Sequence, residues 1–311
     1  MNHGTPKRCA PQNPGQREAQ PRDLVGLAWL ARAQPITTGQ FCRYLGMSRP
    51  VGWRALRRLR DLGLVEVHVT GMEQDNAYTL AAGGARLLAR VHGRASGDYR
   101  LLRGPVSVNA HHRAVVDVAT GLACASMQAT SVHAAEFTFE AELRRRVHNA
   151  KDALVPDAVA VLHYDVGTIA YAIEIDLGEE NPSLLSRKFA ALHELRRVEV
   201  PLVGVADWRV LVVVPTERRL HRLALGCAAD ARVPPGLVSF AVSGDLEDAT
   251  ILDQGWWEAS VDASGKHVDL TMVSPFRGAR ATRSDGSNSL TMVASGSSGD
   301  LADRFGTGGA R

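Results

Sequence analysis

The chain has 311 residues, of which 45% are hydrophobic, which is typical of a globular protein with two ordinary domains. No stretch approaches the roughly 18 consecutive apolar residues of a membrane-spanning helix, and the N-terminal residues lack the apolar core of a secretory signal. The four cysteines are far apart, which excludes a disulfide framework and a CxxC metal motif and predicts reduced thiols in a cytoplasmic protein.

The net charge of +3 is the sum of two oppositely charged parts. Residues 1–105 contain 16 Arg or Lys and 7 Asp or Glu, a net charge of +9. Residues 106–311 contain 20 Arg or Lys and 26 Asp or Glu, a net charge of −6. The first part is therefore suited to a polyanion such as nucleic acid, and the second part is not.

Composition divides the chain into five segments. Residues 1–21, rich in Pro, Gln, Gly and Arg, are predicted to be a disordered basic arm, and residues 276–311, rich in Gly and Ser, a disordered tail. Between them we expect a helical domain with a hairpin at 22–92, a linker at 93–105 and an α/β domain at 106–275.

The basic domain begins with a predicted helix at 22–33, where apolar residues recur at helical spacing. A short helix capped by Thr37 or Thr38 follows and ends at Gly46. A third helix starts at Ser48, two strands "LVEVHVT" and "NAYTL" form a hairpin around "GMEQD", and "AAGGARLLARV" closes the domain as a helix.

The third helix is predicted to have an apolar face and a basic face. Arg54, Arg57 and Arg58 are spaced i, i+3 and i+4, so they should share the outward face. The residues expected to face the core are Val51, Leu56, Leu59 and Leu62.

This order of elements resembles the winged helix-turn-helix, whose third helix lies in the major groove of DNA. The resemblance implies double-stranded DNA as a partner. The alternative is a winged helix that contacts only proteins, with the arginines as a solvated face. The candidate DNA-binding residues are Arg49, Arg54, Arg57 and Arg58.

The pattern of residues 106–275, in the acidic part of the chain, predicts an α/β domain with a mixed sheet. A long helix at 106–126 carries His111 and His112 near its start, and a strand then runs into a polar segment. The remaining predicted elements are a hairpin of strands 158–163 and 169–177, a helix after Asn181, a buried strand at 209–215 and a helix starting at Thr216.

Carboxylates gather on the predicted hairpin. Glu174 and Asp176 alternate with Ile173 and Ile175, so both acidic side chains should lie on one face of the second strand. Asp157 directly precedes the first strand, and the hairpin should bring it close to Glu174. Buried carboxylates need cations, hydrogen-bond donors or water, because an unpaired buried charge costs roughly several kcal/mol.

The strings "PDAVAV", "AIEIDLGEE" and "LSRKF" are similar to the core of PD-(D/E)xK nucleases, the fold of restriction endonucleases. The resemblance implies a Mg²⁺ site with Asp157, Glu174 and Asp176 as metal ligands. The lysine expected two residues after Glu174 is replaced by Asp176, which counts against nuclease activity, and Lys188 on the following helix is the candidate replacement. The candidate catalytic residues are Asp157, Glu174, Lys188 and Glu142.

Each of these carboxylates also has a structural interpretation. Glu174 can pair with an arginine such as Arg187, and Asp176 can cap the turn that follows it. Glu140 competes with Glu142 for the role of further acidic ligand, and either can pair instead with Arg144, Arg145 or Arg146.

The order of all these motifs, over residues 22–260, resembles the replication-relaxation family of plasmids and other mobile elements. The resemblance implies DNA binding and a role in plasmid replication or DNA relaxation, with replication or relaxation proteins as further partners. Three functions remain open: a non-catalytic DNA-binding accessory protein, a magnesium-dependent nuclease or nickase, and a winged-helix transcription regulator whose second domain senses a ligand or a partner. The regulator would have an apolar pocket in that domain and, if it is a dimer, a palindromic operator.

Overall fold

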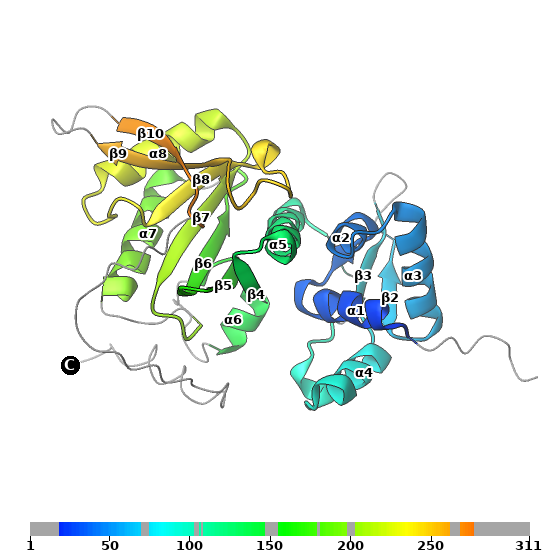
Figure 1. The fold of residues 1–311 in the computed structure, drawn as a ribbon. Coiled ribbons are helices and arrows are strands. Elements are labelled where there is room, and N and C mark those ends of the chain that lie inside the picture. Colours follow the sequence, from blue (N-terminus) through cyan, green and yellow to red (C-terminus); the bar gives the residue numbers. More distant parts are fainter. Residues whose placement is uncertain are drawn as a thin grey trace, which may run out of the picture. The chain divides into compact units, whose positions relative to one another are not determined.

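The structure is a computed structural model in which the chain divides into two compact units, Met1–Val108 and Asn109–Arg311 (Figure 1). No helix among the described residues is long and apolar enough to cross a membrane. The predicted arm up to residue 18, the tail from residue 277, residues 70–74 of the hairpin turn and residues 103–105 of the linker lie outside the described residues. Those described are 19–69, 75–102, 106, 108–146, 155–178, 181–197, 203–261 and 268–276.

The first unit contains the predicted succession of three helices, a hairpin and a closing helix. Its strands form an antiparallel sheet in the order β1-β3-β2. The elements are α1 (Pro21–Ala33), β1 (Ile36–Thr37), α2 (Thr38–Tyr44), α3 (Arg49–Asp61), β2 (Val65–His68), β3 (Ala77–Leu80), α4 (Ala82–His92) and the short η1 (Ser96–Asp98).

Local sequence accounts for the ends of these helices. Thr37 and Gln40 form a reciprocal capping box at the start of α2, with hydrogen bonds of 3.2 and 2.9 Å. Helix α3 has Pro50 in its first turn, where a missing N–H costs no helical hydrogen bond. Helix α4 ends at Gly93, whose φ of 63° is readily adopted only by glycine.

Helix α3 packs through a face that is slightly rotated from the one predicted. Leu56 and Leu59 are buried as expected, but Val51 is 38% exposed, and Gly52 and Ala55 take the inward positions beside the leucines. A Cβ atom on Gly52 would lie 2.1 Å from the Cys42 sulfur of α2. The crossing of α2 and α3 therefore depends on a residue without a side chain.

The second unit is a mixed α/β structure, and this confirms the predicted fold class. Its seven strands lie in the order β10-β9-β8-β7-β6-β5-β4, with β6, β7 and β8 parallel and the remaining pairs antiparallel. The elements are α5 (Ala110–Gln128), β4 (Val132–Phe139), α6 (Glu140–Arg146), β5 (Ala158–Tyr164), β6 (Gly167–Ile175), α7 (Pro182–Arg197), β7 (Trp208–Val214), α8 (Glu217–Ala229), β8 (Val238–Val242), η2 (Ser243–Asp245), β9 (Trp256–Val261) and β10 (Val268–Val273).

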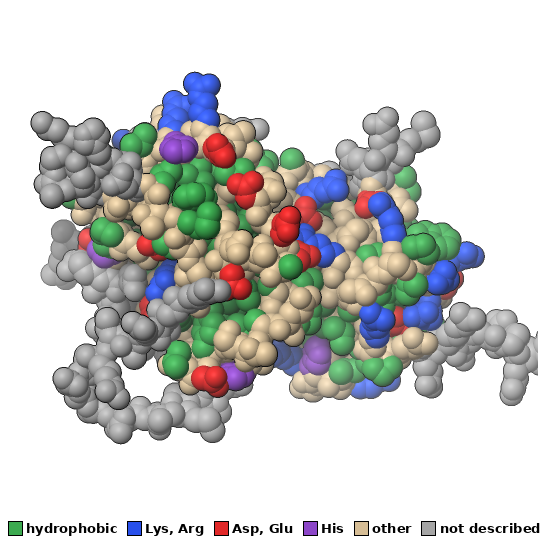
Figure 2. All heavy atoms as spheres, turned by 45° about the horizontal axis from the view of Figure 1, so that its top comes forward, with side chains coloured by type: hydrophobic (Ala, Val, Ile, Leu, Met, Phe, Trp, Pro, Cys, Tyr) green, Lys and Arg blue, Asp and Glu red, His purple; other side chains and the backbone are tan. Residues whose placement is uncertain are grey.

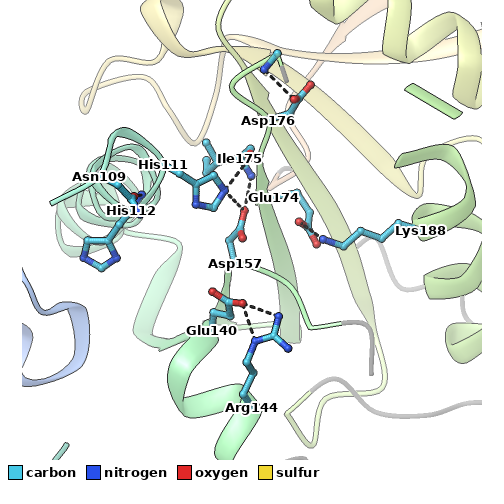
Figure 3. Close-up of polar contacts among 11 residues, drawn as sticks. Asn109, His111, His112, Glu140, Arg144, Asp157, Glu174, Ile175, Asp176 and Lys188 are labelled. Carbon is cyan, nitrogen blue, oxygen red and sulfur yellow. Dashed lines mark hydrogen bonds and ion pairs between the residues drawn. The ribbon is translucent and has the colours of Figure 1, made fainter. Parts of the chain in front are cut away.

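The central strand β6 separates two layers of helices. Ala170 and Ala172 belong to a buried cluster that includes Phe189 of α7 and Leu220 of α8, so this face of β6 packs on those helices. Helix α5 lies on the other side of β6 (Figure 3). Consecutive side chains of β6 therefore face different helices. This alternation determines the direction of the Glu174 carboxylate.

Candidate functional site

The outward face of α3 carries exposed cationic and aromatic side chains. Arg54 and Arg57 are exposed, as the helical spacing predicts. The Arg57 guanidinium carbon lies 5.5 Å from the ring centroid of Trp53, within cation–π range. Its Nε is 3.9 Å from the Asp61 carboxylate, an exposed pair that adds little stability.

Arg58 does not share this outward face, contrary to the prediction. It turns toward α1 and donates hydrogen bonds of 2.5 to 2.9 Å to both carboxylate oxygens of Asp23. Asp23 is 1% exposed, so Arg58 neutralises a buried charge inside the unit. The prediction that Arg58 lies on the outward face is therefore wrong, and its side chain stabilises the contact between α3 and α1.

Arg49 stands at the start of α3 and joins it to the base of the hairpin. It is ion-paired with Asp75, while 67% of its side chain remains exposed. The pair borders an open groove of about 540 Å³ between α2, α3 and the hairpin. The groove is lined by Thr38, Arg49, Pro50, Trp53, Arg54, Asp75 and Asn76.

In the second unit, Asp157 and His111 together close the end of β6 (Figure 3). The Ile175 amide donates a 2.8 Å hydrogen bond to Asp157 Oδ2, and the Ile175 carbonyl lies 3.1 Å from His111 Nε2. The His111 Nε2 and Asp157 Oδ2 atoms are 3.2 Å apart. Both backbone groups of Ile175 are thus satisfied by side chains where strand β5 has not yet begun.

The protonated form of His111 is favoured by this arrangement. The hydrogen bond to Asp157 is the main cause that raises the pKa of His111, and the charges of Asp157 and Glu140 and the Ile175 carbonyl act in the same direction. Partial burial opposes them. Asp157 therefore faces a histidine whose pKa it raises, on the α5 side of the sheet.

Glu174 points to the opposite side of β6, toward α7 (Figure 3). Its Oε2 accepts a 2.6 Å hydrogen bond from Lys188 Nζ, and its side chain is 5% exposed. Lys188 thus reaches the carboxylate, as the hypothesis of a displaced lysine requires, while Arg187 is exposed. A charge-assisted hydrogen bond of this length is among the stronger contacts a buried carboxylate can make.

Asp176 is held by a third partner and lies one residue beyond β6. Its Oδ2 is 2.5 Å from Arg219 Nε of α8, and its Oδ1 accepts a 2.8 Å hydrogen bond from the Gly178 amide. The alternative in which Asp176 caps the following turn is the one observed. Local sequence does not predict Arg219 as the partner of Asp176, because the two residues are 43 positions apart.

Glu140 and Glu142 of α6 do not join the other carboxylates in a common metal site. Glu140 accepts hydrogen bonds from Arg144 in the next turn, one of the pairings that the sequence left open. Its amide donates a 2.9 Å bond to the Asp157 carbonyl. Glu142 is half-buried on the same helix.

The predicted magnesium ligands do not fit a preformed metal site. Asp157 faces His111, Glu174 faces Lys188 and Asp176 faces Arg219, so each carboxylate has a basic partner. Within the described parts of the chain, no three His, Cys, Asp or Glu side chains are placed to hold a metal ion. The three carboxylates thus have three separate basic partners around the end of β6.

One comparison with known proteins identifies a family. A family model described as replication-relaxation matches residues 27–205, more than half of the chain. Among solved structures, the restriction endonuclease FokI bound to DNA is 10% identical, with a TM-score of 0.25, and the match covers 74% of this chain. The chain spans 44% of the FokI chain. No curated protein matches.

Proposed function

Because the chain belongs to the replication-relaxation family, we propose that it is a cytoplasmic DNA-binding accessory protein of plasmid or mobile-element replication or DNA relaxation. The first unit binds double-stranded DNA through α3. The second unit is non-catalytic and contacts DNA or a replication or relaxation protein.

The exposed basic face of α3 is the observation that carries this proposal. Arg54 and Arg57 project from the third helix of a helix–turn–helix arrangement, within a segment whose net charge is +9. Arg49 is 67% exposed at the start of the same helix. A helix with this charge and position is suited to the major groove, where its arginines can contact phosphates or base edges.

A salt series tests the proposal. Fluorescence anisotropy with a labelled plasmid-derived duplex should show that log Kd changes linearly with log salt concentration. The double variant R54A/R57A should bind more weakly, with a slope lower by about 2. The matched control is R86A/R90A, which removes two exposed arginines from α4. Equal binding by the two double variants would overturn the assignment of α3.

The non-catalytic assignment of the second unit rests on its ion pairs. Each carboxylate of the predicted metal site already faces a basic side chain, so metal binding would require these pairs to separate. A protein partner or DNA can be contacted without that rearrangement. The acidic charge of residues 106–311, a net −6, favours a protein contact there.

A nuclease is the second candidate, because Lys188 Nζ lies 2.6 Å from Glu174 Oε2. In that function Lys188 would hold the Glu174 carboxylate in position. Supercoiled plasmid incubated with Mg²⁺ or Mn²⁺ should remain uncut if the protein is an accessory factor. The contrary result is nicking by the wild type that is lost in both E174A and K188A while DNA binding stays intact. That result would show that the protein is a nuclease and would overturn the non-catalytic assignment.

The regulator alternative predicts an apolar pocket in the second unit. A cavity of about 300 Å³ lies there, between the end of α5, the start of β4 and the turn around Leu252. Gln128, Ser131 and Asp253 line it together with apolar side chains. Polar side chains thus interrupt the apolar lining that the regulator alternative predicts.

A further inference from the structure

Trp53 is an exposed tryptophan on the outward face of α3. It is 48% exposed, whereas Trp29, Trp208 and Trp256 are at most 3% exposed. An indole normally contributes to stability by burying its large apolar surface. Trp53 leaves half of that surface in contact with solvent, so the packing of the unit does not account for it.

The position of Trp53 places it among the proposed DNA-binding arginines. Pro50, Trp53, Arg54 and Arg57 are spaced i, i+3, i+4 and i+7, which forms one stripe along a helix. The Arg57 guanidinium lies 5.5 Å from the centre of the Trp53 ring, so each side chain restricts the other. Trp53 is thereby held on the outward face of the helix.

The surroundings combine an apolar centre with cationic edges. Trp53 and Pro50 line the groove of about 540 Å³, and Arg49 and Arg54 line it with them. Figure 2 shows hydrophobic side chains with Lys and Arg side chains beside them at the right-hand edge, where Figure 1 has α3. Cations at the edge of such a surface suit the phosphates that border a groove of DNA.

We propose, on the basis of the proposed function, that Trp53 reads the floor of the major groove by apolar contact with the methyl groups of thymine. The thymine C5-methyl is the apolar group that the major groove presents, and A·T pairs are the pairs that carry it. The flanking arginines supply affinity for phosphates that is independent of sequence. Trp53 adds a preference for thymine-containing sites that does not depend on salt.

Two synthetic duplexes test this contact, because they differ only in the methyl group. The wild-type protein should bind poly(dA–dT) about four-fold more tightly than poly(dA–dU), the effect of removing one methyl group from an apolar contact. W53A should bind both duplexes equally, with an unchanged salt slope. R54A should keep the preference and lose about one unit of the salt slope.

The matched control is V25A, which removes an exposed apolar side chain from α1, where 49% of Val25 is accessible. V25A should retain the four-fold preference. W53F preserves an aromatic ring and should retain part of it, which separates loss of contact from loss of folding. Tryptophan emission should change when poly(dA–dT) is added to the wild type, and not when it is added to W53F.

The outcomes separate this inference from the function on which it rests. Salt-dependent binding with equal affinity for the two duplexes would overturn the role of Trp53 and leave the DNA-binding function standing. A preference for poly(dA–dT) that survives in W53A would also overturn it. Failure of the folded wild-type protein to bind either duplex would overturn the proposed function itself.

Discussion

Arg58 of α3 donates hydrogen bonds to both carboxylate oxygens of Asp23 in α1, and the aspartate is 1% exposed. Truncation of the arginine would leave a buried carboxylate without its charge partner. R58A should therefore lower the free energy of unfolding by about 3 kcal/mol, measured by urea denaturation.

The exposed neighbour Arg57 is the control for this prediction. R57A should change the free energy of unfolding by less than about 0.5 kcal/mol, because its side chain is 58% exposed and its pair with Asp61 is solvated. A loss of stability in R57A equal to that in R58A would contradict the distinction between the two arginines.

Lys188 and Glu174 should be energetically coupled. K188M leaves the Glu174 carboxylate buried without its cation, so the free energy of unfolding should fall by about 2 kcal/mol. The double variant E174Q/K188M removes both charges and should recover part of this loss. A double-mutant cycle from chemical denaturation measures the coupling, and the exposed Arg187 provides the control variant R187A. Additive effects of the two substitutions would exclude an ion pair that matters for stability.

Gly52 should tolerate no side chain. A Cβ atom at this position would lie 2.1 Å from the Cys42 sulfur, so α2 and α3 would have to separate. G52A should lower the free energy of unfolding by about 1 to 3 kcal/mol. Gly97 is a suitable control, because nothing lies within 4 Å of a Cβ atom built there. The melting temperatures of G52A and G97A are compared by thermal denaturation. Equal melting temperatures would contradict the prediction that only G52A is destabilised.

The stability of the second unit should depend on the protonation of His111. The pKa of His111 is raised in the folded state, chiefly by its hydrogen bond to Asp157. The contribution is complete below the unfolded pKa of about 6.5 and is lost as the pH rises through the folded pKa. Thermal midpoints measured from roughly pH 6 to 9 should therefore fall for the wild type and fall less for H111Q. The exposed His221 supplies the control H221Q, which should follow the wild type.

Local patterns in the sequence predicted the elements well, because their signals are local. Ser48 and Pro50 predicted the start of α3, which begins at Arg49. The hairpin of β5 and β6 lies where alternation and the turn at Asp165 placed it, with the second strand ending at Ile175 instead of residue 177. Membership of the replication-relaxation family, inferred from the order of motifs, is confirmed.

The partners of the charged residues were harder to predict, because they lie far apart in the sequence. Arg58 has the helical spacing of an outward residue, yet its partner is 35 positions away in α1. The alternation of residues places Asp176 on the same face as Glu174. The strand ends before Asp176, however, and its carboxylate pairs with Arg219 of α8. Periodicity assigns a side chain to a face of its own element and does not identify what packs against that face.

The two side chains that bond the end of β6 come from very different distances along the chain. The hairpin of β5 and β6 forms from residues close in sequence, but the Ile175 carbonyl acquires its partner only when His111 arrives from 64 positions away. The neighbouring Ile175 amide is fixed by Asp157, which His111 itself helps to orient. Hydrogen exchange at this one amide would report whether Asp157 is in place at the end of β6.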